Sequence, residues 1–382
     1  MQVGLLRRNW PAMLDALGGL IPRRRRRLKS REIAQAVFRG ILDRDPDMGD
    51  RRRWAGFFRS GAALEHTIRV LIGSAEFQTR MLKTLVPAVE LPDLTRLMPE
   101  MYQVQQITNG ALRVFTGRSD EDITRLVDLI ERHRYYDRFG AATPVIDLDK
   151  QITASIIQAL GAKSCFELGC FTAPVISLLA DAGVRVLGAE TSHLAFAFAY
   201  SNVRNALLYG DLLDLTIDER FDAVLCMDVL EHVSPLRLDA YLQAIVSLLG
   251  SDGYLYVNSP MFGSDPIFGA AEPPYLEEWR LVGDRSYWRH WPCDERGWPL
   301  HGHLIWASPA WWAGKFAAHG LVRDATIEQV IQHRLAGFFR YAPGRRTLFV
   351  LRREGAASSS AAAAAAIDAA LATLPGLPPP EA

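Results

Sequence analysis

A strand-like segment that ends in an acid and a glycine is the sequence feature that most constrains this fold. Residues 164–168 form a short apolar run containing Glu167, and Gly169 follows directly, before a helical pattern at 173–182. Further strand patterns, separated by helical ones, come at 185–190, 206–210, 221–227 and 253–258. Strands that alternate with helices predict a parallel sheet with helices on both faces.

The same alternation continues toward the C-terminus. A helical pattern at 309–319 precedes strand patterns near 321–329 and 346–352, which brings the expected strands to seven. The other helices of this α/β domain are expected near 148–160, 192–203 and 236–249.

Acidic residues stand at the ends of the first four expected strands. They are Glu167, Glu190, Asp211 and Asp228. Parallel strands open into a crevice at their carboxyl ends, where the strand order reverses, so we expect these acids to meet there. The loop after Gly169 lacks the G-x-G-x-x-G pattern on which a pyrophosphate rests, which argues against NAD and FAD. An acid at this place suits a cationic ligand instead.

At these residues the sequence resembles the class I S-adenosylmethionine-dependent methyltransferases, over about residues 148–352. The resemblance implies a Rossmann-like seven-stranded sheet and S-adenosylmethionine as cofactor. In that family the first strand ends in acid-x-Gly-x-Gly-x-Gly, whereas this chain has Phe171 and Ala173 at the later glycine positions. Glu190 is expected to accept from both ribose hydroxyls, and Asp211 from the adenine amino group. The expected cofactor contacts are Glu167, Gly169, Cys170, Phe171, Glu190, Thr191, Asp211, Leu212 and Met227.

The segment after the fourth strand carries the expected reaction chemistry. Asp228 is followed by Glu231-His232, and His301-Gly302-His303 comes later in the chain. This pattern resembles ubiquinone-pathway O-methyltransferases and small-RNA 2′-O-methyltransferases, in which such residues bind a divalent metal. The resemblance implies His232 and Asp228 as catalytic residues. It implies Mg²⁺, Mn²⁺, Fe²⁺ or Zn²⁺ on Asp228, Glu231, His232 and either His303 or His301. In the alternative interpretation no metal binds, and His232 acts as a base or only caps and packs.

A long insertion is expected at residues 260–308, between the fifth strand and the next helix. Seven of the nine tryptophans fall between Trp279 and Trp312. Insertions at this sheet edge usually form an acceptor pocket or lid. Aromatic side chains there suit a sugar ring or a flat apolar acceptor, and the alternative is that they form the core of the insertion itself.

The expected domain organisation places the catalytic part after an N-terminal extension. Up to Arg31 there are nine basic residues against one acid, which indicates either peripheral contact with an anionic membrane or a solvated leader. The next segment resembles a short bacterial helical module of unknown function. The expected parts are a basic leader (1–30), an all-α module (31–85), a helical connector (86–147), the methyltransferase domain (148–354) and a disordered Ala/Pro-rich tail (355–382).

Composition limits the function further. The net charge is zero, so no nucleic-acid partner is expected. The four cysteines form no CxxC pair and no run of about 18 apolar residues occurs, which predicts a cytoplasmic protein with reduced thiols. We expect O-methylation of a hydroxyl on a sugar or glycan-linked intermediate. The alternatives are methylation of a phenolic or lipid-like small molecule, and a non-catalytic binding or scaffold protein with a decayed cofactor loop.

Overall fold

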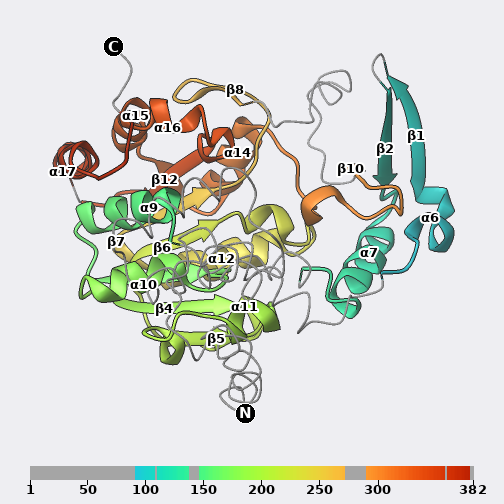
Figure 1. Cartoon of the computed structure of the whole chain (residues 1–382), viewed down its shortest axis with the longest axis horizontal. Helices are drawn as coiled ribbons and strands as arrows, with labels where there is room; N and C mark the ends of the chain where they lie inside the picture. The colour runs from blue at the N-terminus through green and yellow to red at the C-terminus, as the bar shows by residue number, and fades with distance from the viewer. Residues whose placement is uncertain (1–90, 108–109, 137–145, 272–289, 358, 379–382) are drawn as a thin grey trace, which may run out of the picture. The chain divides into compact units, whose positions relative to one another are not determined.

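The computed structural model describes residues 91–107, 110–136, 146–271, 290–357 and 359–378 (Figure 1). The chain divides into two compact units, residues 1–88 with 141–145, and residues 89–140 with 146–382. Every described residue belongs to the second unit. The expected basic leader and all-α module therefore lie outside the described residues.

A seven-stranded sheet in the order β11-β12-β7-β6-β3-β4-β5 is the main layer of this unit (Figure 1). Strands β3 to β7 are parallel to one another, whereas β12 is antiparallel to both of its neighbours, β7 and β11. The strands are β3 (Ser164–Leu168), β4 (Arg185–Glu190), β5 (Leu207–Tyr209), β6 (Phe221–Met227), β7 (Leu249–Asn258), β11 (Leu321–Arg323) and β12 (Leu348–Arg353). This sheet confirms the predicted Rossmann-like α/β class.

Helices cover both faces of the sheet because strand residues alternate between two cores. Cys165 of β3 packs in a cluster with α9, α10, α15 and α17, whereas its neighbour Phe166 packs in a second cluster with α12 and α14. The helices are α9 (Leu148–Ala159), α10 (Pro174–Asp181), α11 (His193–Ala197), α12 (Leu238–Leu248), α14 (Pro309–Ala318), α15 (Ala325–Arg334), α16 (Ala336–Phe339) and α17 (Ser360–Ala372).

The strand order reverses between β3 and β6. The chain runs outward from β3 through β4 to β5, then returns to the other side of β3 with β6 and β7. A ligand crevice is expected beyond the carboxyl ends of β3 and β6. Short 3-10 turns border this edge and the loops near it: η3 (Leu212–Asp214), η4 (Leu230–His232), η5 (Leu300–Gly302) and η6 (Pro343–Arg345). A further turn, η2 (Arg204–Ala206), directly precedes β5 at the other end of the strand.

The expected helical connector at 86–147 is wrong for its first half. Residues Tyr102–Ile107 (β1) and Gly110–Thr116 (β2) form an antiparallel hairpin, and β10 (His290–Pro292) of the insertion pairs with β2. The error has a physical cause, since the third strand comes from a distant part of the chain. The other elements here are α6 (Leu94–Leu97), η1 (Pro99–Met101) and α7 (Asp120–Arg132).

The connector and part of the insertion share one core, and we call residues 91–107, 110–136 and 290–306 the small subdomain. Phe115 of β2 and Ile123 of α7 are fully buried in this core together with Trp291 and Trp298. Figure 1 shows its three strands at one end of the described unit, apart from the seven-stranded sheet. Four tryptophans of the expected insertion and the following helix are therefore core residues: Trp291, Trp298, Trp306 and Trp312.

Three further sequence expectations differ from the structure. The strand expected at 321–329 ends at Arg323, because the Asp324 side chain accepts from Ile327 N and starts α15. The helix expected at 192–203 is only the five residues of α11. The tail expected to be disordered contains α17, whose Ile367 and Leu371 lie one turn apart and are buried against the core. The remaining hairpin is β8 (Gly263–Asp265) with β9 (Gly269–Ala271).

No helix among the described residues is long and apolar enough to cross a membrane.

Candidate functional site

A cavity of about 910 Å³ opens at the carboxyl edge of the sheet, where the strand order reverses. Its walls come from the ends of β3, β4, β5 and β6, from α9, from the small subdomain and from η6. Every residue expected to contact the cofactor lines it: Glu167, Gly169, Cys170, Phe171, Glu190, Thr191, Asp211, Leu212 and Met227. The expected catalytic residues Asp228 and His232 line it as well.

The loop after β3 has the backbone conformation of a glycine-rich loop, although only the first of the three glycines, Gly169, is present. Gly169, Phe171 and Ala173 have φ of 64°, 55° and 63°, all in the left-handed region. Each side chain held there costs roughly 1–2 kcal/mol. A Cβ on Gly169 would lie 2.5 Å from Cγ2 of Val229, so the backbone needs glycine at this place. The substitutions at 171 and 173 therefore leave the loop conformation intact.

Glu167 is a buried carboxyl that borders the cavity. It is 4% exposed, and its Oε2 has no hydrogen-bond partner among the described residues. Burial raises the pKa of Glu167 to about 8, although the Ile176 amide and the charge of Lys150 act in the opposite direction. A buried, unpartnered carboxyl costs stability, so its presence beside a cavity marks a ligand-binding position.

Glu190 ties two cavity loops together at the end of β4. Its Oε2 accepts from Phe171 N at 2.7 Å, and its Oε1 accepts from Ser192 N at 2.6 Å. The side chain is 8% exposed. Glu190 thus fixes the left-handed loop directly. Its contact with ribose hydroxyls stays a prediction.

Asp211 has structural partners that the sequence did not indicate. Its Oδ1 accepts from Leu213 N at 2.9 Å, and its Oδ2 pairs with Arg237 Nη1 at 2.9 Å. These contacts connect the end of β5 with the start of α12. Asp211 lines the cavity as expected, and its contact with an adenine amino group stays a prediction.

Three of the four expected metal ligands come together beside the cavity. Single ligand atoms of Glu231, His232 and His303 all lie within 4.8 Å of one another. Glu231 is fully buried; its Oε2 accepts from Ser259 Oγ at 2.9 Å, and its Oε1 has no partner in the part of the chain that the structure describes. The imidazole rings of His232 and His303 have centroids 4.9 Å apart. His301 lies 5.6 Å from His303 by centroids and is not part of the cluster.

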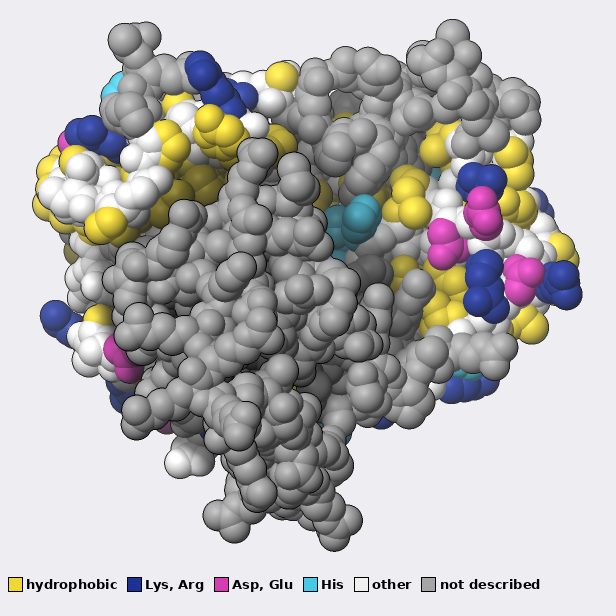
Figure 2. All heavy atoms as spheres, viewed as in Figure 1, with side chains coloured by type: hydrophobic (Ala, Val, Ile, Leu, Met, Phe, Trp, Pro, Cys, Tyr) yellow, Lys and Arg dark blue, Asp and Glu magenta, His cyan; other side chains and the backbone are white. Residues whose placement is uncertain are grey.

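The protonation of the two histidines follows from their surroundings. His232 Nδ1 lies 3.1 Å from the Gly302 carbonyl oxygen, which makes Nδ1 the donor and leaves Nε2 without a proton. Burial lowers the pKa of His232, and it lowers the pKa of His303 well below the usual range. Both rings are therefore neutral near pH 7 and can act as ligands or as bases. Figure 2 shows histidine side chains at the surface near the middle of the view.

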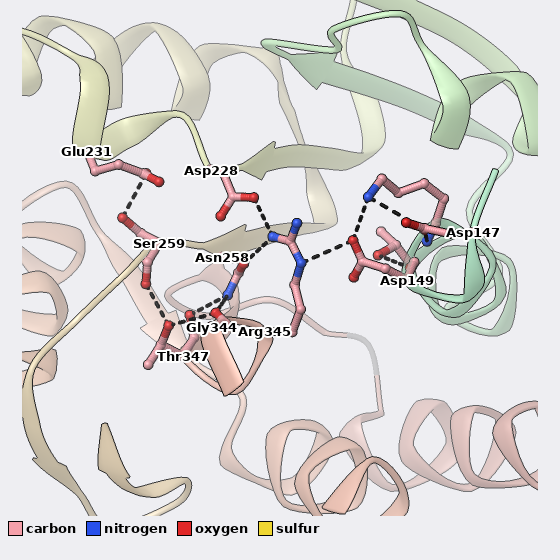
Figure 3. A network of polar contacts seen from close by, with 11 residues as sticks. Asp147, Asp149, Asp228, Glu231, Asn258, Ser259, Gly344, Arg345 and Thr347 are labelled. Carbon is pink, nitrogen blue, oxygen red and sulfur yellow. Dashed lines mark hydrogen bonds and ion pairs between the residues drawn. The ribbon is translucent and has the colours of Figure 1, made fainter. Parts of the chain in front are cut away.

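Asp228 is not part of the metal-ligand cluster. It has a φ of 54°, and its Oδ2 accepts from Arg345 Nη1. Arg345 also donates to Asn258 Oδ1 at 2.7 Å and pairs with Asp149 at 3.0 Å (Figure 3). The expected set of four metal ligands is corrected to three residues, because the Asp228 carboxylate pairs with the guanidinium of Arg345 in η6 instead.

Sequence reasoning missed the residues that build the site from outside the sheet. Tyr136 Oη donates to the Gly302 carbonyl oxygen at 2.9 Å, the same acceptor that His232 uses. A Cβ on Gly302 would lie 2.5 Å from the Tyr136 ring. The small subdomain thus holds the turn that presents His303. In the sequence, the segment His301-Gly302-His303 indicates this part of the site, whereas neither Tyr136 nor Arg345 lies in a recognisable motif.

Comparisons with known proteins show what a part of this chain is similar to. Residues 166–257 match the family model described as a methyltransferase domain. A ubiquinone biosynthesis O-methyltransferase from Bradyrhizobium diazoefficiens is 28% identical over 115 residues, covering 27% of this chain and 42% of that protein. The chain thus matches less than half the length of this curated relative.

Two solved structures illustrate the likeness. A 1,6-didemethyltoxoflavin-N1-methyltransferase from Burkholderia thailandensis has 14% identity and a TM-score of 0.38, covering 66% of this chain and 99% of that chain. An amino pentose methyltransferase from Micromonospora echinaspora has 17% identity and a TM-score of 0.36, covering 59% and 96%. At these TM-scores they add nothing to what the sheet order shows. The predicted resemblance is confirmed by the family match, which covers residues 166–257.

Proposed function

We propose that the protein transfers a methyl group from S-adenosylmethionine to a hydroxyl oxygen of a sugar or a glycan-linked intermediate. One observation carries the proposal: all nine residues expected to contact the cofactor line one cavity, which His232 and His303 also border. The matched curated relative is an O-methyltransferase, which supports oxygen as the acceptor atom.

The residues of the cavity fit the proposed cofactor. A volume of about 910 Å³ lies at the upper end of the range for sites that enclose small ligands. The left-handed loop from Gly169 to Ala173 lets the backbone approach a ligand closely, and the acids Glu167 and Glu190 suit a cation. When bound, the cofactor supplies an electrophilic methyl group on a sulfonium. The retained loop conformation is evidence against a decayed, non-catalytic site.

His232 is the proposed general base. Its Nδ1–H is held by the Gly302 carbonyl, so Nε2 is available to take a proton from an acceptor hydroxyl. The lowered pKa keeps the ring neutral at pH 7. Positioning of the acceptor oxygen in line with the methyl group is expected to supply most of the remaining acceleration.

A divalent metal on Glu231, His232 and His303 is the second part of the proposal. The buried unpartnered atoms Oε1 of Glu231 and Nδ1 of His303 fit a metal, and a donor set of one carboxylate and two imidazoles suits Zn²⁺, Fe²⁺ or Mn²⁺. Bound there, a metal would lower the pKa of a neighbouring hydroxyl. His232 would then be a ligand rather than the base, so metal dependence separates the two roles.

Calorimetry with S-adenosylhomocysteine tests the cofactor site. The wild type should bind, and Glu190→Ala should bind at least about tenfold more weakly because a charged hydrogen-bond acceptor is lost. An analogue without the ribose 2′-hydroxyl is the matched ligand control, since its affinity should respond less to the substitution. Absence of binding to the wild type would refute the proposed cofactor.

A methyl-transfer screen with labelled S-adenosylmethionine tests the acceptor class. Sugars and glycan-linked lipids with neighbouring hydroxyls are compared with phenols of similar size. Transfer to the sugars supports the proposal, whereas transfer only to phenols replaces it with the small-molecule alternative. The same assay after chelation tests the metal.

A further inference from the structure

Four charged side chains of alternating sign form a row along one wall of the cavity. Lys150 Nζ pairs with Asp149 Oδ2 at 2.7 Å, and Arg345 Nε pairs with the same oxygen at 3.0 Å. Arg345 Nη1 in turn donates to Asp228 Oδ2. Figure 3 shows Arg345 between Asp149 and Asp228. All four residues line the cavity, and we call them the charge row.

The row comes from three separate parts of the fold. Lys150 and Asp149 belong to the first turn of α9, Asp228 follows β6, and Arg345 ends η6. Asn258, at the end of β7, fixes η6, since its Nδ2 donates to the carbonyl oxygens of Gly344 and Thr347. Asn258 therefore fixes both the backbone of η6 and the guanidinium of Arg345, which donates to its Oδ1.

Both ends of the Arg345–Asp228 pair retain unused polar atoms. Arg345 Nη2 has no hydrogen-bond partner among the described residues, and Figure 3 shows one guanidinium nitrogen without a contact. Asp228 Oδ1 also has no partner among them. The Arg345 side chain is 26% exposed and that of Asp228 is 41% exposed, so both side chains are accessible to a ligand at the cavity wall.

The charges in the row cancel, which selects the kind of ligand. Two cations and two carboxylates give no net charge, so a simple anion or a simple cation would upset the balance. A zwitterion bears one charge of each sign a few ångströms apart, and it matches an adjacent donor and acceptor. The α-amino-acid group is the commonest small zwitterion, and the proposed methyl donor carries one at its methionine end.

We propose that the charge row binds the zwitterionic amino-acid end of the methyl donor. Arg345 Nη2 donates to the carboxylate with Lys150 beside it, and Asp228 Oδ1 accepts from the ammonium group. Asp149 holds the two cations in place. This role rests on the proposed function, and it gives Asp228 a task in donor binding in place of metal binding.

The test compares two ligands rather than two proteins alone. S-adenosylhomocysteine and its decarboxylated analogue differ only in the carboxylate, so their affinity ratio isolates its contribution. In the wild type we expect a ratio of about ten or more, the range for a hydrogen bond between charged groups. In Arg345→Gln the ratio should fall toward one, while binding of the decarboxylated analogue changes little.

A matched control uses an arginine with similar partners elsewhere. Arg323 contacts the carboxylates of Asp265 and Glu328 and does not line the cavity. Arg323→Gln should leave the ligand ratio at the wild-type value. If Arg345→Gln fails to fold, Lys150→Gln answers the question, because this side chain is 26% exposed and pairs with Asp147 and Asp149 alone among the described residues; its ratio should fall about threefold or more.

The outcomes are distinct. A wild type that binds neither ligand overturns the proposed function. A wild type that binds both, with the same ratio in Arg345→Gln and Lys150→Gln, overturns the role of the charge row; a row that receives a zwitterionic acceptor instead of the donor would give this result. A ratio that collapses in both variants and not in Arg323→Gln supports the inference.

Discussion

The carboxyl of Glu167 should cost the protein stability, and the substitution Glu167→Gln should recover it. Glu167 is 4% exposed and Oε2 has no partner, so the folded state favours the protonated carboxyl and raises its pKa from 4.5 to about 8. The unfolded chain ionises this group near 4.5. The free energy of unfolding should therefore fall as the pH rises from about 4.5 to about 8, and then become constant.

The size of the effect follows from the same two values. At 1.36 kcal/mol for each pKa unit, the interval between 4.5 and about 8 corresponds to at most about 5 kcal/mol. Local relaxation around the carboxylate reduces this, so we expect roughly 2–5 kcal/mol. Glutamine keeps the size and one hydrogen-bond acceptor, and it does not ionise. Glu167→Gln should match the wild type within about 1 kcal/mol at pH 5 and exceed it by roughly 2–5 kcal/mol at pH 8.5.

Urea unfolding followed by tryptophan fluorescence measures this difference, because unfolding exposes tryptophans that are buried in the folded protein, such as Trp306 and Trp312. Glu328→Gln is the contrasting variant. Glu328 is fully buried like Glu167, but it pairs with Arg323 and accepts from Val350 N at 2.9 Å. Burial raises the pKa of Glu328 as well, to about 7, but its substitution removes a buried partner of Arg323 and should therefore destabilise the protein at neutral pH instead of stabilising it. A Glu167→Gln variant that is less stable than the wild type, or equally shifted at every pH, would refute the reasoning.

A gain in stability would also have a functional meaning. Glu167→Gln should weaken binding of S-adenosylmethionine, because the cavity loses an acid that suits a cationic ligand. Residues that lower stability and raise affinity are characteristic of binding sites. A variant that is more stable at pH 8.5 and binds the ligand as well as the wild type would remove Glu167 from the site.

Three further predictions concern the loop, the C-terminal helix and the metal. Gly169→Ala should destabilise by about 2–4 kcal/mol, because its Cβ would lie 2.5 Å from Val229. Ala173→Gly should change the free energy of unfolding by less than about 1 kcal/mol, since relieved strain offsets lost packing and added chain entropy. Urea unfolding compares the two variants, and a larger loss in Ala173→Gly would contradict the loop interpretation. Ile367→Ala should cost about 2–4 kcal/mol and exposed Ala365→Ser less than about 0.5 kcal/mol; equal costs would mean that α17 does not pack on the core. His303→Ala should lose Zn²⁺ or Mn²⁺ after dialysis, as measured by mass spectrometry, and His301→Ala should retain it; equal metal content in both variants and the wild type would remove the metal site.

The sheet could be predicted because parallel strands are buried on both faces. Residues 164–168, 185–190 and 221–227 read as short apolar runs and were assigned with the observed bounds. The small subdomain could not be predicted in this way. Its third strand, β10, pairs with β2 through partners such as Trp291 and Phe115, which are 176 positions apart. No local pattern reports such a pairing.

The acidic residues that line the cavity were predictable for a related reason. Glu167, Glu190 and Asp211 each close a strand, and the sheet brings strand ends to one edge. The glycine positions were harder to interpret, since Phe171 and Ala173 look like departures from the motif, yet their backbone has the left-handed conformation of glycine. Residue type and backbone conformation are therefore separate pieces of evidence, and only the structure supplies the second.

The structure gives Asp228 and His232 different hydrogen-bond partners, although the sequence predicts both as catalytic. Asp228 Oδ2 accepts from Arg345, so this carboxylate acts as a fixed charge and is poorly placed to take a proton from an acceptor. His232 has its Nδ1 proton fixed by Gly302, and its lowered pKa leaves the ring neutral. Asp228→Asn should therefore raise the dissociation constant of the donor, whereas His232→Ala should lower kcat with little change in donor binding. Equal effects of the two substitutions on donor affinity would show that the two residues act as one unit.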